Sequence, residues 1–326
     1  MDGTPPRRAI ERRFASVGGE GPLLLALAGD SASGKSTLSR GVEYVLGVPR
    51  VTRVCTDDYH RFDRAERARL GVTPLDPATN RMDLLAEHLR ALATGRAVTK
   101  PTYEHHTGTF GDDEAIEPGE IVIVEGLLPL ADRATRDTID VAVFLEPEEV
   151  LRRRWKLERD VFERGYSAQQ VVDEIRGRET DALAHVGPQR AFADIVVSFH
   201  RRPDAPDDEH LSASLTLRPT IPYPGLRELI GSLHGEGRAP IRWRTDTGGN
   251  GPVSVLDIDG DCPPDLGTDI ERVLWSALRP DDRLQRDRIG IVRTPGRPER
   301  RSEALALTQL LIVAYLVGVL DGAFDL

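Results

Sequence analysis

The sequence has few of the features that mark an exported or membrane protein. Only two of its 326 residues are cysteines, Cys55 and Cys262, which argues against a disulfide-stapled secreted fold and favours a reducing, cytoplasmic setting. The N-terminal segment lacks the apolar run of a signal peptide. A long apolar run near the other end, Ala304–Leu320, contains the polar residues Thr308 and Gln309, so we expect a buried helix there and no membrane anchor.

Basic residues are fewer than acidic residues. The chain carries 43 Lys+Arg against 53 Asp+Glu, a net charge of −10, which argues against bulk binding of nucleic acid and requires any anion site to be a local cluster. Lysine is scarce, because arginine fills every Lys+Arg position except Lys35, Lys100 and Lys156. A lysine kept against this bias indicates a place where a compact ammonium serves better than a wide guanidinium.

Short apolar runs alternate with helical patterns between residues 23 and 200. This alternation predicts a parallel sheet built from β-α-β units, and so an α/β domain over residues 22–200 with helices on both faces of a mainly parallel sheet. The expected strands are 23–28, 51–56, 121–124, 141–145 and 195–199, and the expected helices are 36–46, 83–93, 148–163 and 168–176.

The rest of the chain is expected to form three smaller parts. Residues 1–21 are an N-terminal extension, and the polar, proline-bearing stretch 201–210 is a predicted linker. Residues 211–326 predict a smaller α+β region with no chemical motif of its own. Its expected strands are 211–217, 253–258 and 289–292, and its expected helices are 269–278 and 304–320.

A phosphate-binding motif directly follows the first expected strand. It runs Gly29, Asp30, Ser31, Ala32, Ser33, Gly34, Lys35, Ser36 and Thr37, and it matches the Gly-x4-Gly-Lys-Ser pattern of a P-loop. In such a loop, backbone N–H groups hold phosphate oxygens, the lysine reaches the β- and γ-phosphates, and the serine hydroxyl binds Mg²⁺. The motif therefore predicts a site for a nucleoside triphosphate with Mg²⁺.

Carboxylates follow two of the other expected strands. Asp57 and Asp58 come after 51–56, and Glu125 ends 121–124, so all three are expected at the sheet edge where open α/β folds bind ligands. A carboxylate there suits a base that accepts a hydroxyl proton or a ligand of Mg²⁺. The alternative for residues 57–64 is an ordinary polar turn.

Charged side chains line one side of the expected helix 148–163. Lys156, Arg159, Asp160 and Arg164 are spaced by three and four residues, which places them along one stripe. Such stripes are usually solvated salt-bridge faces. Here the P-loop and the acidic segment 57–64 favour a role in the same site.

These segments together resemble the phosphoribulokinase and uridine kinase family of P-loop kinases, and within it the plant and cyanobacterial type of phosphoribulokinase. The resemblance implies a P-loop kinase fold, ATP and Mg²⁺ as cofactors, phosphorylation of D-ribulose 5-phosphate at its C1 hydroxyl, and a homodimer. A kinase of uridine or of another sugar phosphate, and a nucleotide-binding regulator without turnover, are the alternatives. The similar stretches are 29–37, 57–64 (DDYHRFDR), 71–84, 100–108 (KPTYEHHTG), 122–130, 155–165 (WKLERDVFERG), 253–260 and 307–317.

The resemblance also implies a role for each matching residue. Asp57 is expected to be the general base. The other implied catalytic positions are Lys35, Lys156 and Asp160, the metal ligands are Ser36 and Glu125, the nucleotide is held by residues 29–37, and the sugar phosphate is held by His60, Arg64, Tyr103, His105, Arg159 and Arg164.

Overall fold

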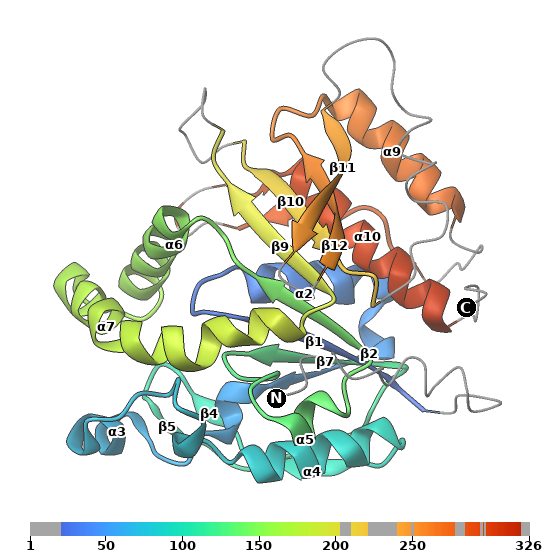
Figure 1. Ribbon diagram of the computed structural model, residues 1–326. Helices are drawn as coiled ribbons and strands as arrows, with labels where there is room; N and C mark the ends of the chain where they lie inside the picture. Colours follow the sequence, from blue (N-terminus) through green and yellow to red (C-terminus); the bar gives the residue numbers. More distant parts are fainter. Residues whose placement is uncertain are drawn as a thin grey trace. The chain divides into compact units, whose positions relative to one another are not determined.

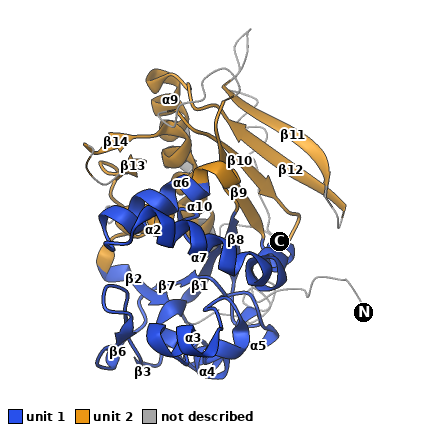
Figure 2. Ribbon diagram, turned by 90° about the vertical axis from the view of Figure 1, so that its left-hand side faces the viewer, with its two compact units in different colours: residues 1–35, 49–145, 152–193 blue, residues 36–48, 146–151, 194–326 orange. Residues whose placement is uncertain are grey.

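The described residues of the chain form two compact units. The computed structural model describes residues 21–202, 210–220, 240–248, 251–277, 284–293, 296 and 298–320. Unit 1 takes its described residues from 21–35, 49–145 and 152–193, and unit 2 takes them from 36–48, 146–151 and 194–320 (Figure 2). All but the last residue of the predicted extension 1–21, and most of the predicted linker 201–210, lie outside the described residues.

Unit 1 is built on a parallel sheet. Its strands lie in the order β2 (Val51–Cys55), β7 (Ile121–Gly126), β1 (Leu23–Gly29) and β8 (Val141–Leu145), and each adjacent pair is parallel. Every residue of β1, β7 and β8 is buried, which is why these strands are continuous apolar runs. The predicted parallel α/β fold is confirmed.

Helices of unit 1 cover both faces of these strands. Figures 1 and 2 both place α4 and α5 on one side of the sheet and α7 on the other. Ser167 caps α7: its hydroxyl oxygen accepts a hydrogen bond from the backbone N–H of Gln170, and Oε1 of Gln170 accepts one from the backbone N–H of Ser167. The helices are α3 (Arg64–Leu70), α4 (Met82–Ala93), α5 (Arg133–Arg136), α6 (Glu149–Phe162), of which all but the start belongs to unit 1, and α7 (Ala168–Asp181).

Short strands and one-turn helices connect the larger elements of unit 1. A 3₁₀ turn, η2 (Thr56–Tyr59), follows β2 directly. Two small antiparallel pairs follow α4: β3 (Val98–Lys100) with β6 (Glu114–Ile116), and β4 (Tyr103–Glu104) with β5 (Thr109–Phe110). The sequence analysis did not predict these pairs, because runs of two or three residues carry no readable periodicity.

Unit 2 combines antiparallel strands with helices, as the α+β pattern predicts. Its strands lie in the order β9 (Ile195–His200), β10 (Ser212–Leu217), β12 (Gly251–Ile258) and β11 (Ile241–Gly248). Its other elements are α2 (Lys35–Leu46), α9 (Pro264–Ala277), α10 (Glu303–Leu320) and the pair β13 (Ile291–Val292) and β14 (Arg300–Arg301). Strand β11 was not predicted, because its sequence IRWRTDTG is mostly polar and exposed.

The apolar run near the C-terminal end forms the helix α10, which is buried as expected. Gln309 on this helix donates from Nε2 to the carbonyl oxygen of Thr37 (3.2 Å) and accepts from the backbone N–H of Gly290 (2.8 Å). A Cβ on Gly41 of α2 would lie 1.9 Å from that Gln309 nitrogen, so only glycine permits this approach. These contacts group α2 with unit 2, whereas the predicted domain limit at residues 200–210 put it with the first domain.

No helix within the described ranges combines the length and the hydropathy needed to cross a bilayer.

A core substitution in β1 should destabilise the chain strongly. Leu25 is 0% exposed at the centre of the parallel sheet, so Leu25→Ala should lower the free energy of unfolding by about 2–5 kcal/mol through lost contacts and a cavity. Leu183, which is 74% exposed, is the matched control, and Leu183→Ala should change stability by no more than about 0.5 kcal/mol. Urea titration of both variants measures this, and equal losses would contradict the assigned burial.

Candidate active site

The loop between β1 and α2 has the strained backbone of a phosphate cradle. Gly29 has φ +151° and Gly34 has φ +94°, and a Cβ on Gly29 would lie 2.6 Å from the carbonyl oxygen of Leu145. Ala32 also adopts a positive φ of 62°. Glycine at positions 29 and 34 avoids the collision or backbone strain that a side chain would cause there.

Lys35 holds this loop together from inside. Its Nζ donates to the carbonyl oxygens of Gly29 (2.8 Å) and Asp30 (2.7 Å) and to Oγ of Ser33 (3.3 Å). Burial lowers the pKa of Lys35, against the opposing effect of Asp30 and other nearby carboxylates. The ammonium therefore lies where phosphate oxygens would compete for it. Ser36 follows at the start of α2 with an exposed side chain.

Asp57 is a partly buried carboxylate beside a histidine. It lies in η2, where β2 ends, and its Oδ2 is 3.4 Å from Nε2 of His105. Burial alone raises the pKa of Asp57, but His60, His105, Lys35 and Arg164 outweigh burial and leave the pKa below its ordinary value. Asp57 is therefore ionised near neutral pH, as a proton acceptor must be.

Asp58, next to Asp57, has a structural role. Asp58 accepts hydrogen bonds from Nζ of Lys100 (2.8 Å) and from the backbone N–H of Tyr103 (2.9 Å). The same lysine also contacts Glu114 at 2.9 Å, so it joins η2 to the β3–β6 pair. The polar-turn interpretation thus suits Asp58, while the adjacent Asp57 is directed to His105.

Aromatic and imidazole rings lie beside Asp57. The Tyr103 ring packs edge-on against His60 (centroids 4.9 Å apart) and His105 (5.3 Å). Nδ1 of His60 lies 2.8 Å from Oδ1 of Asn80, and burial lowers the pKa of both His60 and His105. Of the positions assigned to the sugar phosphate, His60, Tyr103 and His105 are therefore together.

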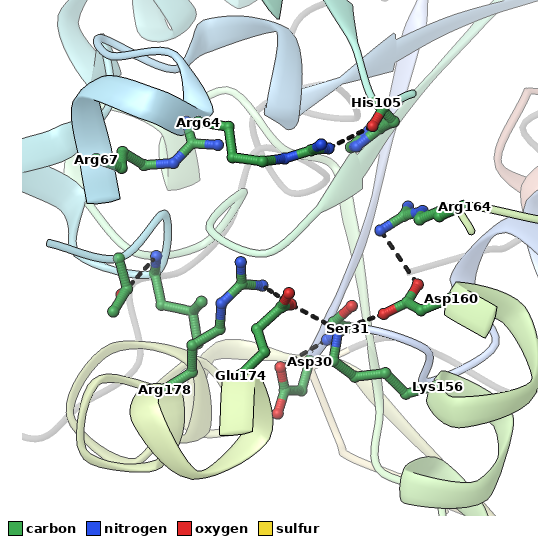
Figure 3. Close-up of polar contacts among 12 residues, drawn as sticks. Asp30, Ser31, Arg64, Arg67, His105, Lys156, Asp160, Arg164, Glu174 and Arg178 are labelled. Carbon is green, nitrogen blue, oxygen red and sulfur yellow. Dashed lines mark hydrogen bonds and ion pairs between the residues drawn. The ribbon is translucent and has the colours of Figure 1, made fainter. Parts of the chain in front are cut away.

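Two arginines of α3 hold this group in place. Nη2 of Arg64 donates to the carbonyl oxygen of His105, and Figure 3 shows the side chain extended along that loop. Nη2 of Arg67 donates to the Tyr103 hydroxyl at 2.8 Å. Arg64 was predicted from the sequence but Arg67 was not, because its only signal is its position three residues further along α3.

The charged stripe of α6 is organised around one buried carboxylate. Asp160 is 0% exposed and contacts Nζ of Lys156 (2.7 Å), Nη2 of Arg159 (2.8 Å) and Nη1 of Arg164 (3.3 Å) (Figure 3). Burial raises the pKa of Asp160, but Arg159 and Lys156 reverse this and lower it. The stripe is therefore not a solvated salt-bridge face.

Lys156 is buried between two carboxylates. Its side chain is 2% exposed, and its Nζ is bound by Asp160 and, at 2.8 Å, by Oε1 of Glu174 on α7. Arg178 contacts the same Glu174 oxygen at 2.8 Å. Glu174 carries no motif and lies 18 residues from Lys156, so the sequence analysis had no signal for it.

The other arginines of α6 reach the P-loop. Nη2 of Arg159 donates to Oγ of Ser31 at 3.0 Å, and Nη1 of Arg152 contacts Oδ2 of Asp30 at 2.9 Å. Two guanidinium groups therefore border the loop that would hold a nucleotide. Arg152 was not predicted, although its spacing of seven residues from Arg159 keeps it on the same stripe.

Glu125 lies at the carboxyl end of β7, and its carboxylate accepts a hydrogen bond from Nη2 of Arg53 on β2. It is buried, with Leu27 and Cys55 opposite it on the neighbouring strands. A serine hydroxyl and a carboxylate are oxygen donors of the kind that Mg²⁺ prefers, so Ser36 and Glu125 fit the expected metal by their chemistry.

Comparisons with known proteins agree with this geometry. The Phosphoribulokinase / Uridine kinase family profile matches residues 24–205, more than half of the chain. The chain belongs to this family. The match includes the P-loop, the Asp57 segment and the charged stripe of α6, so the residues that form the site lie within the family's own region.

Relatives within the family include both named activities. A phosphoribulokinase from Synechocystis sp. is 39% identical over 54% of this chain and 53% of its own length. The chloroplastic phosphoribulokinase of Triticum aestivum is 36% identical over 74% of this chain and 68% of its own length. A uridine kinase from Chloroflexus aggregans is 32% identical over 54% of this chain and 86% of its own length. The chain thus spans about half the length of the first of these relatives.

Among solved structures, a phosphoribulokinase from Rhodobacter spheroides superposes with a TM-score of 0.53 at 18% identity, covering 78% of this chain and 96% of that one. This similarity supports the P-loop kinase fold of the family.

Removing the buried ammonium should damage the chain more than removing an exposed guanidinium from the same helix. Lys156→Met leaves Asp160 and Glu174 without their shared cation, so the free energy of unfolding should fall by about 3–5 kcal/mol. The control Arg154→Met removes the surface pair with Glu158 from an exposed position and should cost no more than about 1 kcal/mol. Denaturant titration compares them, and a stable Lys156→Met variant would contradict the structural part of this lysine.

Proposed function

We propose that the chain transfers the γ-phosphoryl group of ATP to the C1 hydroxyl of D-ribulose 5-phosphate, giving ribulose 1,5-bisphosphate and ADP. The observation that carries the proposal is the ionised Asp57 beside His105, in a setting where Lys35 and Arg164 also lower its pKa. A hydroxyl acceptor needs such a base, and an acceptor that carries its own phosphate needs such cations.

In the reaction, Asp57 accepts the proton of the C1 hydroxyl as its oxygen attacks the γ-phosphorus. A new P–O bond forms to the sugar, and the bond to the β-phosphate oxygen breaks to release ADP. Lys35 balances negative charge on the phosphoryl oxygens, where positioning and charge provide most of the catalysis. Ser36 and Glu125 would hold Mg²⁺, which would supply positive charge for the phosphates of the nucleotide.

The acceptor's phosphate is assigned to guanidinium and imidazole groups. Arg159 and Arg164 both contact Asp160, which leaves further N–H donors of each fork for a phosphate. His105 is adjacent to Asp57, so an acceptor held by these groups would bring its hydroxyl to the base. Arg64 and Tyr103 would shape the same subsite through the His105 loop and the ring contact.

Lys156 and Asp160 are proposed to act as positioning residues. Asp160 fixes Arg159 and Arg164, while Arg159 and Lys156 keep Asp160 ionised, and Glu174 on α7 holds Lys156 in place. The family resemblance implies a catalytic role for Lys156. We instead propose the positioning role, because the Lys156 ammonium already binds two carboxylates. A homodimer is expected from the family resemblance, and a cytoplasmic location from the scarcity of cysteine.

A panel of acceptors tests the substrate. With ATP and Mg²⁺, ribulose 5-phosphate should give ADP release far above that with uridine, since a neutral nucleoside makes no use of the arginine forks. The similarity to a uridine kinase makes uridine the right competitor. Coupled measurement of ADP formation decides the question, and phosphorylation of uridine without phosphorylation of ribulose 5-phosphate would refute the proposal.

Replacing the base should affect turnover and spare the nucleotide. Asp57→Asn keeps the side-chain shape but cannot accept the proton, so kcat should fall by about 10²–10⁴-fold while the Kd of ATP changes little. The exposed Asp113 provides the control, and Asp113→Asn should keep full kcat. Steady-state kinetics and ATP-binding calorimetry measure both, and an unchanged kcat for Asp57→Asn would exclude it as the base.

A further inference from the structure

A thiol, a carboxylate and an imidazole converge beside the proposed base. Among the described residues, the ligand atoms of Cys55, Asp57 and His105 all lie within 4.8 Å of one another. We call this group the Cys55 cluster. Cys55 ends β2, Asp57 lies in η2 directly after it, and His105 follows β4, so two separate backbone segments bring the atoms together. The proposed function gives roles to Asp57 and His105 but none to the thiol.

We propose that the Cys55 cluster is an inhibitory site for a borderline-soft divalent cation such as Zn²⁺, which occupies the base Asp57. The inference rests on the proposed function, because inhibition follows only if Asp57 accepts the substrate proton. Sulfur and imidazole nitrogen favour Zn²⁺ over Mg²⁺, which prefers oxygen donors in an octahedral arrangement. The cofactor Mg²⁺ is therefore not a competitor for this donor set.

The spacing of the cluster is close to that of a tetrahedral site. Nitrogen and oxygen ligands about 2.0–2.1 Å from a tetrahedral zinc lie about 3.3 Å from each other. Nε2 of His105 and Oδ2 of Asp57 are 3.4 Å apart, so this edge of the tetrahedron is already formed. The Cys55 sulfur lies within 4.8 Å of a ligand atom on each of these two residues, so the three groups would supply three ligands and leave a fourth for water, as in zinc sites that keep one.

The local charge also suits a dication. Burial and the carboxylates Asp57, Asp58 and Glu125 raise the pKa of the Cys55 thiol well above its ordinary value. A field that disfavours a bare thiolate favours a cation beside it, and on binding, the S–Zn bond replaces the S–H bond as the proton passes to the buffer. Lys35 and Arg164 oppose the cation, so the site should bind more weakly than a structural zinc site with four protein ligands.

The cluster is accessible to an ion in solution. The side chains of Asp57 and His105 are 22% and 40% exposed, and Cys55 is half-buried. The other cysteine, Cys262, is buried in unit 2 and has no such companions among the described residues, which makes it the matched control.

The first experiment detects the metal without turnover. The full chain, kept reduced with a phosphine, is titrated with cobalt(II) chloride, which replaces zinc and reports a thiolate ligand by a charge-transfer band in the near ultraviolet. The wild type and Cys262→Ala should show the band, and Cys55→Ser should lack it. A wild-type chain without the band overturns the proposal.

The second experiment measures inhibition of ADP formation by zinc chloride under saturating Mg²⁺ and ATP. A zinc-selective chelator should restore the wild-type rate, and Cys55→Ser should need about tenfold or more zinc for half-inhibition, because one of three ligands is lost. Equal zinc sensitivity of the two proteins overturns the proposal. A cobalt band at Cys55 in a protein that phosphorylates no acceptor would refute the proposed function and the inhibition, but not the metal site.

A third measurement needs no substitution, should Cys55→Ser fail to fold. Iodoacetamide alkylates free thiols, and mass spectrometry of the digested chain gives the rate at Cys55. Zinc chloride should slow this rate in the wild type, because a zinc-bound thiolate is no longer free to react. An alkylation rate at Cys55 that zinc leaves unchanged refutes the site.

Discussion

The site depends on the neutralisation of one buried carboxylate. Asp160 has no exposed surface, and a lone charge in that position would cost several kcal/mol in lost hydration. Lys156, Arg159 and Arg164 supply the compensating charge. Arg159 also donates a hydrogen bond to Ser31 of the P-loop. The contacts that neutralise Asp160 therefore also position a guanidinium group beside that loop. The same contacts therefore stabilise this part of the fold and set the geometry of the site.

The scarcity of lysine has a physical meaning in this arrangement. Each of the three lysines binds two or more oxygens from different directions: Lys35 within the P-loop, Lys100 between Asp58 and Glu114, and Lys156 between Asp160 and Glu174. An ammonium has three donors that rotate freely, whereas a guanidinium presents its donors in a fixed plane. Lysine is kept where one cation must join separate segments in a narrow space.

What the sequence could predict follows from how local each signal is. The strands β1, β7 and β8 were found because both faces are covered and the runs are continuously apolar. Strand β11 was not predicted, because its polar sequence is typical of a loop and its strand structure depends on pairing with β12. The P-loop and Asp57 could be found from motifs of a few residues. Glu174 and Asn80 could not, because their importance comes from partners 18 and 20 residues away, and only the tertiary structure shows which distant groups meet.

The charges around η2 affect both the pKa of the proposed base, Asp57, and its tendency to bind a metal. Cations and imidazoles near Asp57 lower its pKa, while the carboxylates around Cys55 raise the pKa of the thiol, so one small region keeps a carboxylate charged and a thiol protonated. That division suits proton transfer, since the thiol does not compete as a nucleophile or as a base. It also carries a cost, because an ionised carboxylate beside a histidine and a cysteine is a donor set that a borderline-soft cation prefers. The ionised state that suits Asp57 to its proposed role as a base thus also makes it a metal ligand, while the cations Lys35 and Arg164, which lower its pKa, oppose the metal.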